Sequence, residues 1–450
     1  MKKTAGKQIL LLLTFIFSTA IYWIELGFSI SGFYVVCATI IILSLTIYYI
    51  KRDLIISSQA GILTLLKLTF FLFAILSFVI NVEDINGQLS LAMWVNRILL
   101  SLTILFSILY FIKSSSIKVL SFLVKRKFLL ILFCSLAIQL TLIRITRVPN
   151  IDVYQVLKYG PQRILSFENP YETSTTTDKF KSIDFGYSFY AYGPTTIYLF
   201  LPFDLILKEP RYLLIIANFT AAFCLYYIAK KFTKEEQFPQ LLSLIYLFNP
   251  RYIYFLTFSF TDSLIMALVA LGLFFYVRKR FNGLAIFLAL AVGVKIFYIL
   301  PYIFFLKHKK LLNLNFIATV IIVLLLIYLP FILHNHQAIY ESIVSLNVGD
   351  KAPNLLQRYT LTFATFLDRQ FGIYPPQKFF LIANLIFISL YWLTIRKTIG
   401  MAKTLMIVSL VFITSIFWGP FGFANYYYNA SQMLLFALAF LGNQKEPIRQ

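Results

Sequence analysis

An acidic residue just beyond an apolar run is the first candidate for chemistry in this sequence. Asp152 follows the run that ends at about Ile145, and it begins the polar segment 146–190. A carboxylate held in a partly desolvated place can take the proton of a hydroxyl group, so Asp152 is a candidate general base. The alternative is a helix N-cap or a solvated loop acid. Tyr154 is a candidate for lining the same substrate pocket.

Three basic residues could bind an anionic substrate. Arg144 and Arg147 flank the end of the run before Asp152, where they either reach lipid headgroups or bind a phosphate. Lys295 lies within an apolar run and has no acidic neighbour in sequence, and an isolated charge in such a run is costly and usually functional. We expect Lys295 to bind phosphate, with simple snorkelling as the alternative. Asp262 could be its ion-pair partner, a helix cap or a pocket residue.

Aromatic residues and histidines provide further candidates. Tyr426, Tyr427 and Tyr428 could stack on a sugar ring or belong to an interfacial aromatic belt. His334 and His336 are better explained as loop histidines than as metal ligands, so no metal site is assigned. The sequence contains no Walker A motif, nucleotide-binding GxGxxG, GxSxG or HExxH, which argues against ATP-driven transport and the corresponding hydrolase classes.

The elements that must position these residues are membrane helices. The chain is 60% hydrophobic and only 13% charged, and apolar runs of 17 or more residues recur along it. This composition predicts an all-α, polytopic integral membrane protein. A net charge of +22 could suggest nucleic-acid binding, but the basic residues form short clusters between the runs, as expected of cytoplasmic loops. We therefore predict that the chain has no nucleic-acid partner and that it lies in a lipid bilayer.

Placing every basic cluster in the cytoplasm predicts about 13 or 14 crossings with both termini inside. The segment 190–207 is then a juxtamembrane or re-entrant helix, and 282–306 is a hairpin of two short helices, in which Gly293-Val294-Lys295 and Pro301 could supply the break. Two large loops, 146–190 and 334–377, lie outside together with the turn before Tyr426. We expect a four-helix module over 1–125 and a catalytic membrane core over 126–445. The other expected spans are 8–24, 28–50, 61–80, 89–112, 128–145, 212–229, 240–257, 260–277, 314–333, 378–395, 403–419 and 424–441.

Several motifs, in order, resemble the GT-C superfamily of membrane glycosyltransferases. The resemblance covers about residues 128–441, and it is most similar to the GPI mannosyltransferase I branch and to bacterial polyprenol-phosphate-mannose-dependent mannosyltransferases. An Asp-x-Asp or Asp-Glu pair is not present at Asp152, so the resemblance implies no certain cofactor and allows a divalent metal. The motifs are Asp152-Val153-Tyr154, Asn169-Pro170-Tyr171, Tyr192-Gly193-Pro194, Leu247-Phe248-Asn249-Pro250, Thr261-Asp262-Ser263, Gly293-Val294-Lys295-Ile296 and Asn425-Tyr426-Tyr427-Tyr428.

The resemblance implies a GT-C fold and a hexosyltransferase activity. A polyprenyl-phosphate-linked sugar, mannose-like by preference, would be the donor, and a glycan, lipid or protein the acceptor. Asp152 would be the general base, and Lys295, Arg144 and Arg147 would bind the donor phosphate. The expected location is a bacterial plasma membrane, with the active site on the extracytoplasmic face. The alternatives are a lipid-linked glycan polymerase or ligase and a polysaccharide flippase or transporter.

Overall fold

The computed structural model confirms an all-α membrane protein. It describes residues 2–21, 28–52, 59–79, 91–112, 116–146, 148–149, 151–172, 190–345, 360–373, 376–395, 400–419 and 422–441. Within these ranges six helices are long and apolar enough to cross a membrane, or seven if one bent pair counts as a single span. Shorter apolar helices accompany them. The larger number of crossings predicted from charge stays a prediction.

The helices follow the apolar runs of the sequence. Most begin and end within a few residues of the expected spans, because a helix is the structure that satisfies the backbone of an apolar segment in lipid. The helices are α1 Lys2–Thr19, α3 Ile30–Arg52, α4 Gln59–Val79, α5 Leu91–Ile108, α6 Lys118–Ile145, α7 Asp152–Gln162, η1 Arg163–Ser166, α9 Pro194–Leu207, α10 Arg211–Phe232, α11 Gln237–Leu247, α12 Pro250–Thr257, α13 Asp262–Val277, α14 Phe281–Val292, η2 Ile296–Tyr298, α15 Ile299–Tyr302, η3 Ile303–Lys307, α16 Leu314–Ile339, η4 Tyr340–Ser345, α19 Phe363–Phe371, α20 Gln377–Thr394, α21 Met401–Phe417 and α22 Ala424–Phe440.

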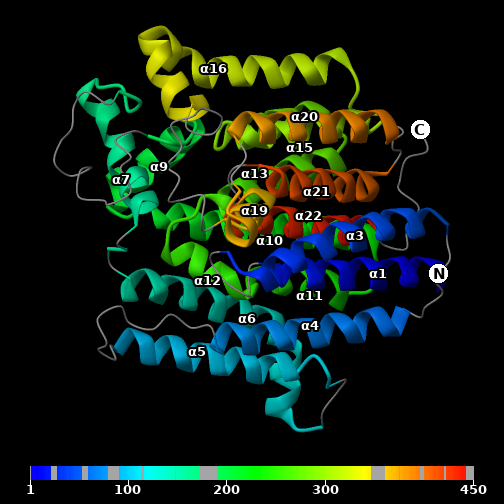
Figure 1. Ribbon diagram of the computed structural model, residues 1–450. Coiled ribbons are helices and arrows are strands. Elements are labelled where there is room, and N and C mark those ends of the chain that lie inside the picture. The colour runs from blue at the N-terminus through cyan, green and yellow to red at the C-terminus, as the bar shows by residue number, and fades with distance from the viewer. Residues whose placement is uncertain are drawn as a thin grey trace.

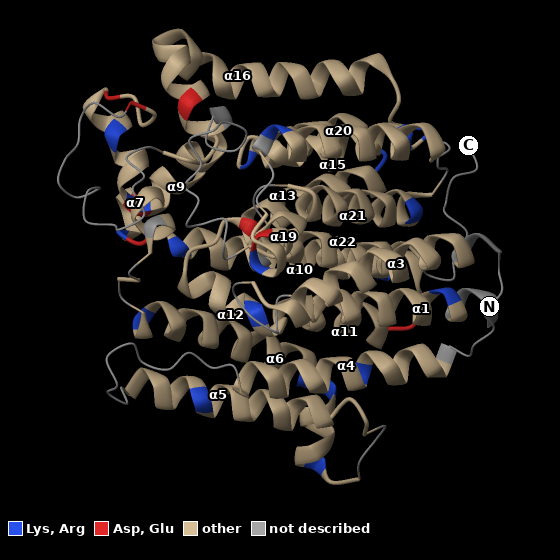
Figure 2. Cartoon of the chain, viewed as in Figure 1, with Lys and Arg blue, Asp and Glu red and all other residues tan. Residues whose placement is uncertain are grey.

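The long helices lie side by side, with α7 and α9 at one end of the bundle and the start of α1 at the other (Figure 1). The centre is formed by α13, which packs against α10, α14 and α22. The first helices belong to the same packed body, since α1 packs against α22 and α3 against α21. Most of the ribbon of the long helices carries no charged residue (Figure 2). The predicted boundary near residue 125 stays a prediction, and α6 runs through it without a break.

Two breaks in the helices determine where the polar residues lie. The expected single span 240–257 is wrong, because α11 ends at Leu247 and a separate helix, α12, starts at Pro250. The chain bends again, by 116°, between α12 and α13. Proline lacks an amide proton and disfavours helical backbone in the residue before it, here Asn249. The expected break at Gly293-Val294-Lys295 is confirmed between α14 and η2. Pro301 lies inside α15 and interrupts nothing.

The two predicted loops contain helices of their own. The segment from Asp152 forms α7, and the expected start of the second loop at His334 lies within α16, which continues to Ile339. The backbone of α16 leaves helical geometry at Asn335, so the helix is kinked there. At 14 residues, α9 is about 21 Å long, shorter than the hydrocarbon core of a bilayer. The expectation that 190–207 is a juxtamembrane or re-entrant helix stays a prediction.

Candidate active site

A buried ion pair joins the first residue of α13 to the break after α14. The Lys295 ammonium nitrogen Nζ lies 3.1 Å from Oδ2 of Asp262 and 3.3 Å from Oδ1. Asp262 is fully buried and Lys295 is 8% exposed. The carboxylate stands at a helix N-terminus, where the backbone dipoles favour negative charge. The acidic partner that the sequence around Lys295 does not contain is therefore supplied by α13, 33 residues earlier in the chain.

Three further side chains donate hydrogen bonds to the Asp262 carboxylate. Asn425 and Asn429 lie one turn apart on α22, so both amides face the same way, and their Nδ2 atoms are 2.8 Å from Oδ2 and 3.0 Å from Oδ1. Tyr298 of η2 donates its hydroxyl to Oδ1 at 3.3 Å and in turn accepts a hydrogen bond from Asn429. The carboxylate thus has a donor for each of its principal lone pairs, which is what a buried charge requires.

Aromatic rings cover one side of the lysine. Lys295 Nζ lies 4.5 Å from the centroid of the Tyr426 ring, close enough for a cation–π interaction. The Tyr426 ring packs against Phe297, with centroids 5.1 Å apart. Tyr427 and Tyr428 differ from Tyr426, since both are fully buried. Only Tyr426 of the three tyrosines shares its surroundings with Lys295.

The backbone before α9 pairs with the break that holds Lys295. The amide of Gly193 donates to the carbonyl of Val294 at 2.9 Å, and the amide of Thr195 donates to that of Gly293 at 3.1 Å. A Cβ atom on Gly193 would lie 2.2 Å from the Gly293 carbonyl oxygen, and one on Gly293 would lie 2.2 Å from the Thr195 hydroxyl. Glycine at both positions therefore lets the two backbones approach and fixes the start of α9 against the Lys295 segment.

The Asn169-Pro170-Tyr171 segment braces the start of α9 and the end of α16. The hydroxyl of buried Tyr171 donates to the Tyr192 carbonyl at 2.9 Å, and its backbone amide donates to the Asn169 side chain at 3.1 Å. Glu172 lies 3.3 Å from Nδ1 of His334 and accepts a hydrogen bond from Asn335 at 3.1 Å. These contacts hold the segment against the kink in α16 and the residues before α9, so its role is structural.

A second buried charge lies beneath α7. Arg211, fully buried at the start of α10, donates to both carboxylate oxygens of Glu209 at 2.8 Å and to the Thr146 hydroxyl at 2.8 Å. Its guanidinium carbon Cζ lies 5.1 Å from the centroid of the Tyr154 ring. Burial, with a smaller contribution from Glu209, raises the pKa of the Tyr154 hydroxyl. Arg211 also donates to the Thr257 carbonyl at 3.5 Å, which connects α7 to the segment leading to Asp262.

The structure places the other predicted site residues as follows. Asp152 is the first residue of α7, where the helix dipole favours a carboxylate, while its side chain lies outside the described part. Arg144 is exposed in the last turn of α6, and Arg147 lies outside the described residues. Lys295, Asp262 and Tyr426 are brought together, whereas Tyr154 belongs to the Arg211 cluster.

Sequence reasoning assigned no role to Tyr298, Asn425, Asn429 or Arg211. A signal was present for the first three, because Lys295 and Tyr298 are three residues apart and the two asparagines four, which is the spacing of neighbours on one helix face. Asp204 of α9 was also missed: it is buried and accepts a hydrogen bond from Gln162 of α7. An acid within an apolar run carries the same signal as Lys295.

The hydrogen-bond donors around Asp262 show whether this carboxylate could bind the divalent metal that the sequence allows. Among the described residues, no three His, Cys, Asp or Glu side chains lie close enough to hold a metal ion. The Asp262 oxygens face an ammonium, two amides and a hydroxyl, which are hydrogen-bond donors rather than metal ligands. This carboxylate therefore does not fit a divalent cation, and no step is derived through one.

Comparison with known proteins gives one result for this part of the chain. Residues 190–343 match the model of Glycosyltransferase family 87. The match includes α9, α13 with Asp262, and the break with Lys295. It supports a membrane glycosyltransferase, and the six long apolar helices support an integral membrane protein. Searches of the curated proteins and of the solved structures find no match.

Proposed function

We propose that the chain is a GT-C type hexosyltransferase that moves a sugar, mannose-like by preference, from a polyprenyl-phosphate carrier to a glycan, lipid or protein acceptor. The reaction takes place at the extracytoplasmic face of a bacterial plasma membrane. The observation that carries the proposal is the Lys295–Asp262 pair: an ammonium fixed in a largely buried place, within a segment that matches a glycosyltransferase family. A fixed cation in low-dielectric surroundings suits an anionic leaving group.

The proposed reaction is a direct displacement at the anomeric carbon. The acceptor oxygen forms the new bond to that carbon, the bond to the carrier phosphate oxygen breaks, and its electron pair leaves with the phosphate. Asp152 takes the acceptor proton. Lys295 stabilises the charge that the phosphate gains, with Arg144 and Arg147 as further cations, and Asp262 holds Lys295 in place. The proposed base, Asp152, and the proposed cation, Lys295, thus lie on different elements, α7 and the break after α14.

The sugar would lie beside Tyr426. A half-buried tyrosine ring next to a lysine ammonium offers a flat apolar surface and a cation together, which suits a hexosyl phosphate. Tyr427 and Tyr428 would hold the start of α22 in place through packing, since the Tyr427 hydroxyl donates to the Leu361 carbonyl at 2.6 Å. Tyr154 would fix the first turn of α7, from which Asp152 acts.

The direct test is sugar transfer from a radiolabelled polyprenyl-phosphate hexose in membranes that contain the full chain. We expect Asp152→Asn to lower the rate at least about 100-fold, the contribution of a general base. Glu168→Gln is the matched control, because it removes a carboxylate of the same segment that is half-exposed and pairs only with Arg163 among the described residues. Transfer by Asp152→Asn at the control rate would overturn the assignment of the base.

A further inference from the structure

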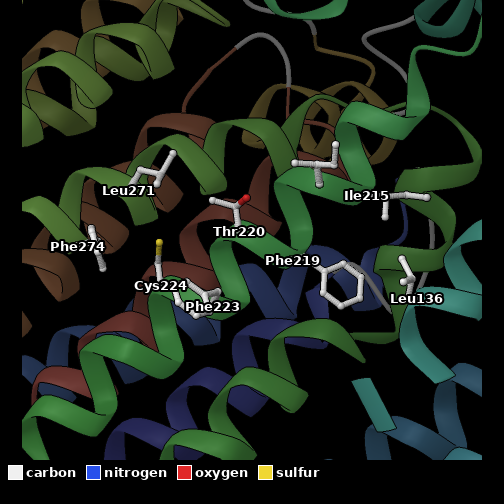
Figure 3. Close-up of a pocket in the computed structure, with 9 residues that line it drawn as sticks. Leu136, Ile215, Phe219, Thr220, Phe223, Cys224, Leu271 and Phe274 are labelled. Carbon is white, nitrogen blue, oxygen red and sulfur yellow. The ribbon is translucent and has the colours of Figure 1, made fainter. Parts of the chain in front are cut away.

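An apolar groove opens on the side of the bundle between α6, α10 and α13. Its volume is about 460 Å³, and it contains no residue of the Asp262 or Arg211 clusters. Figure 3 shows its lining, with Thr220 between Phe219 on one side and Leu271 and Phe274 on the other, and with Leu136 beyond Phe219. Phe223 at its edge is 64% exposed, so the groove opens outward. On a membrane protein this outward side is in contact with lipid chains.

One end of the groove carries basic side chains. Arg278 comes directly after the last residue of α13, four residues beyond Phe274. Its guanidinium carbon lies 4.3 Å from the centroid of the Phe274 ring and 5.4 Å from that of Tyr227. Arg278 is exposed and forms no ion pair with any described residue. On α10, Lys230 lies 5.8 Å from the Tyr226 ring centroid. The apolar lining of the groove thus ends beside the positively charged side chain of Arg278.

The charge balance near that end is strongly positive. The segments 230–236 and 278–280 contain six lysines and arginines and two glutamates. The two segments meet in space, since Lys231 donates to the Val277 carbonyl at 3.5 Å. Clusters of this kind mark the cytoplasmic side of a membrane protein. The groove therefore runs from the interior of the bilayer towards its cytoplasmic, anionic surface.

We propose that this groove binds an anionic phospholipid of the cytoplasmic leaflet, with one acyl chain along α10 and the phosphate against Arg278. The stretch Ile215–Cys224 that lines the groove is about 14 Å long, enough for much of an acyl chain. A hydrocarbon chain fits the apolar lining, and the phosphate provides the charge that complements Arg278 and Lys230. The lipid would hold α6, α10 and α13 at their spacing. The proposal does not depend on the identity of the sugar donor.

The test is a titration of the delipidated full-length protein in detergent with phosphatidylglycerol, with bound lipid counted by native mass spectrometry. We expect phosphatidylglycerol to bind more tightly than phosphatidylcholine, and Arg278→Gln to weaken it about five-fold, the effect of one basic residue at an anionic lipid surface. Arg280→Gln makes the same charge change two residues away at a side chain that does not line the groove, and this variant should bind phosphatidylglycerol within two-fold of the unchanged protein.

The groove itself is tested by Thr220→Trp, which fills it and should reduce binding of both lipids. If that variant does not fold, Phe223→Ala removes an exposed wall of the groove and serves the same purpose. Equal effects of Arg278→Gln and Arg280→Gln would overturn the headgroup site. Unchanged binding in the groove variants would overturn the chain site. Competition by polyprenyl phosphate that displaces phosphatidylglycerol at an equal concentration would show that the groove belongs to the carrier instead.

Discussion

Lys295 donates to both carboxylate oxygens of Asp262, at 3.1 Å and 3.3 Å, although 33 residues separate the two in the chain. Burying either charge without compensation would cost several kcal/mol. Asp262 also accepts hydrogen bonds from Asn425, Asn429 and Tyr298, but Lys295 supplies its only counter-charge among the described residues. The pair therefore ties the start of α13 to the break after α14. We also propose that the Lys295 ammonium binds the donor phosphate. Lys295 would therefore both stabilise the fold and take part in the reaction.

Removal of one partner should separate these two roles. Lys295→Met leaves the Asp262 carboxylate without its counter-charge, and we expect the free energy of unfolding to fall by about 3–5 kcal/mol. Lys295→Met combined with Asp262→Asn removes both charges and should recover part of that loss. Sugar transfer should remain abolished in both variants. Thermal unfolding in detergent and transfer assays on the same preparations measure the two effects; recovery of transfer in the double variant would contradict the phosphate-binding role.

The asparagines of α22 give a second prediction. Asn429→Ala removes a donor from the buried Asp262 carboxylate and should lower the free energy of unfolding by about 1–3 kcal/mol. Asn218→Ala is the control: this side chain is also fully buried, but neither of its amide atoms has a hydrogen-bond partner within the described part of the chain. Its loss should cost less than that of Asn429. Equal losses in a denaturation series would show that the Asn429 contact contributes nothing.

The close approach of two backbones gives a third prediction. Gly193→Ala places a methyl group 2.2 Å from the Gly293 carbonyl oxygen, which cannot move without disturbing the hydrogen bond that it accepts from the Thr195 amide. We expect a loss of about 1–3 kcal/mol or more, as for other overpacked sites, together with reduced transfer. Gly32→Ala meets only side-chain atoms, at 2.9 Å, which can rotate away. A midpoint of thermal unfolding shifted equally by both changes would argue against the backbone contact.

The buried arginine under α7 gives a fourth prediction. Arg211→Met leaves Glu209 without its bidentate partner and removes the contact with Tyr154, so we expect a loss of about 3–5 kcal/mol. Glu168→Gln breaks a half-exposed ion pair with Arg163 and should cost at most about 1 kcal/mol. The comparison is made by chemical denaturation of the two purified variants. A small effect of Arg211→Met would mean that Glu209 finds other donors.

The sequence alone determined the fold class, the approximate positions of most helices and three of the residues that meet at the buried ion pair, Lys295, Asp262 and Tyr426. Long apolar runs leave the backbone one way to satisfy its hydrogen bonds, so the runs became helices. Lys295 was identifiable because burying a charge inside an apolar run costs free energy, so such a residue usually has a functional role or an ion-pair partner. The break at Gly293-Val294-Lys295 could be predicted because basic clusters at 278–280 and 307–310 place both ends of one apolar run on the same side of the membrane. Each of these inferences depends on residues within one run or at its ends.

Tertiary structure decided which distant residues meet. Nothing in local periodicity brings Asn425 and Asn429 to Asp262, because that contact depends on the packing of α22 against α13. The same holds for Gly193, whose role appears only where its backbone reaches Val294, and for Arg211, which reads in sequence as an ordinary helix end. The site consists of contacts between segments far apart in the chain, and only the folded helices bring those segments together.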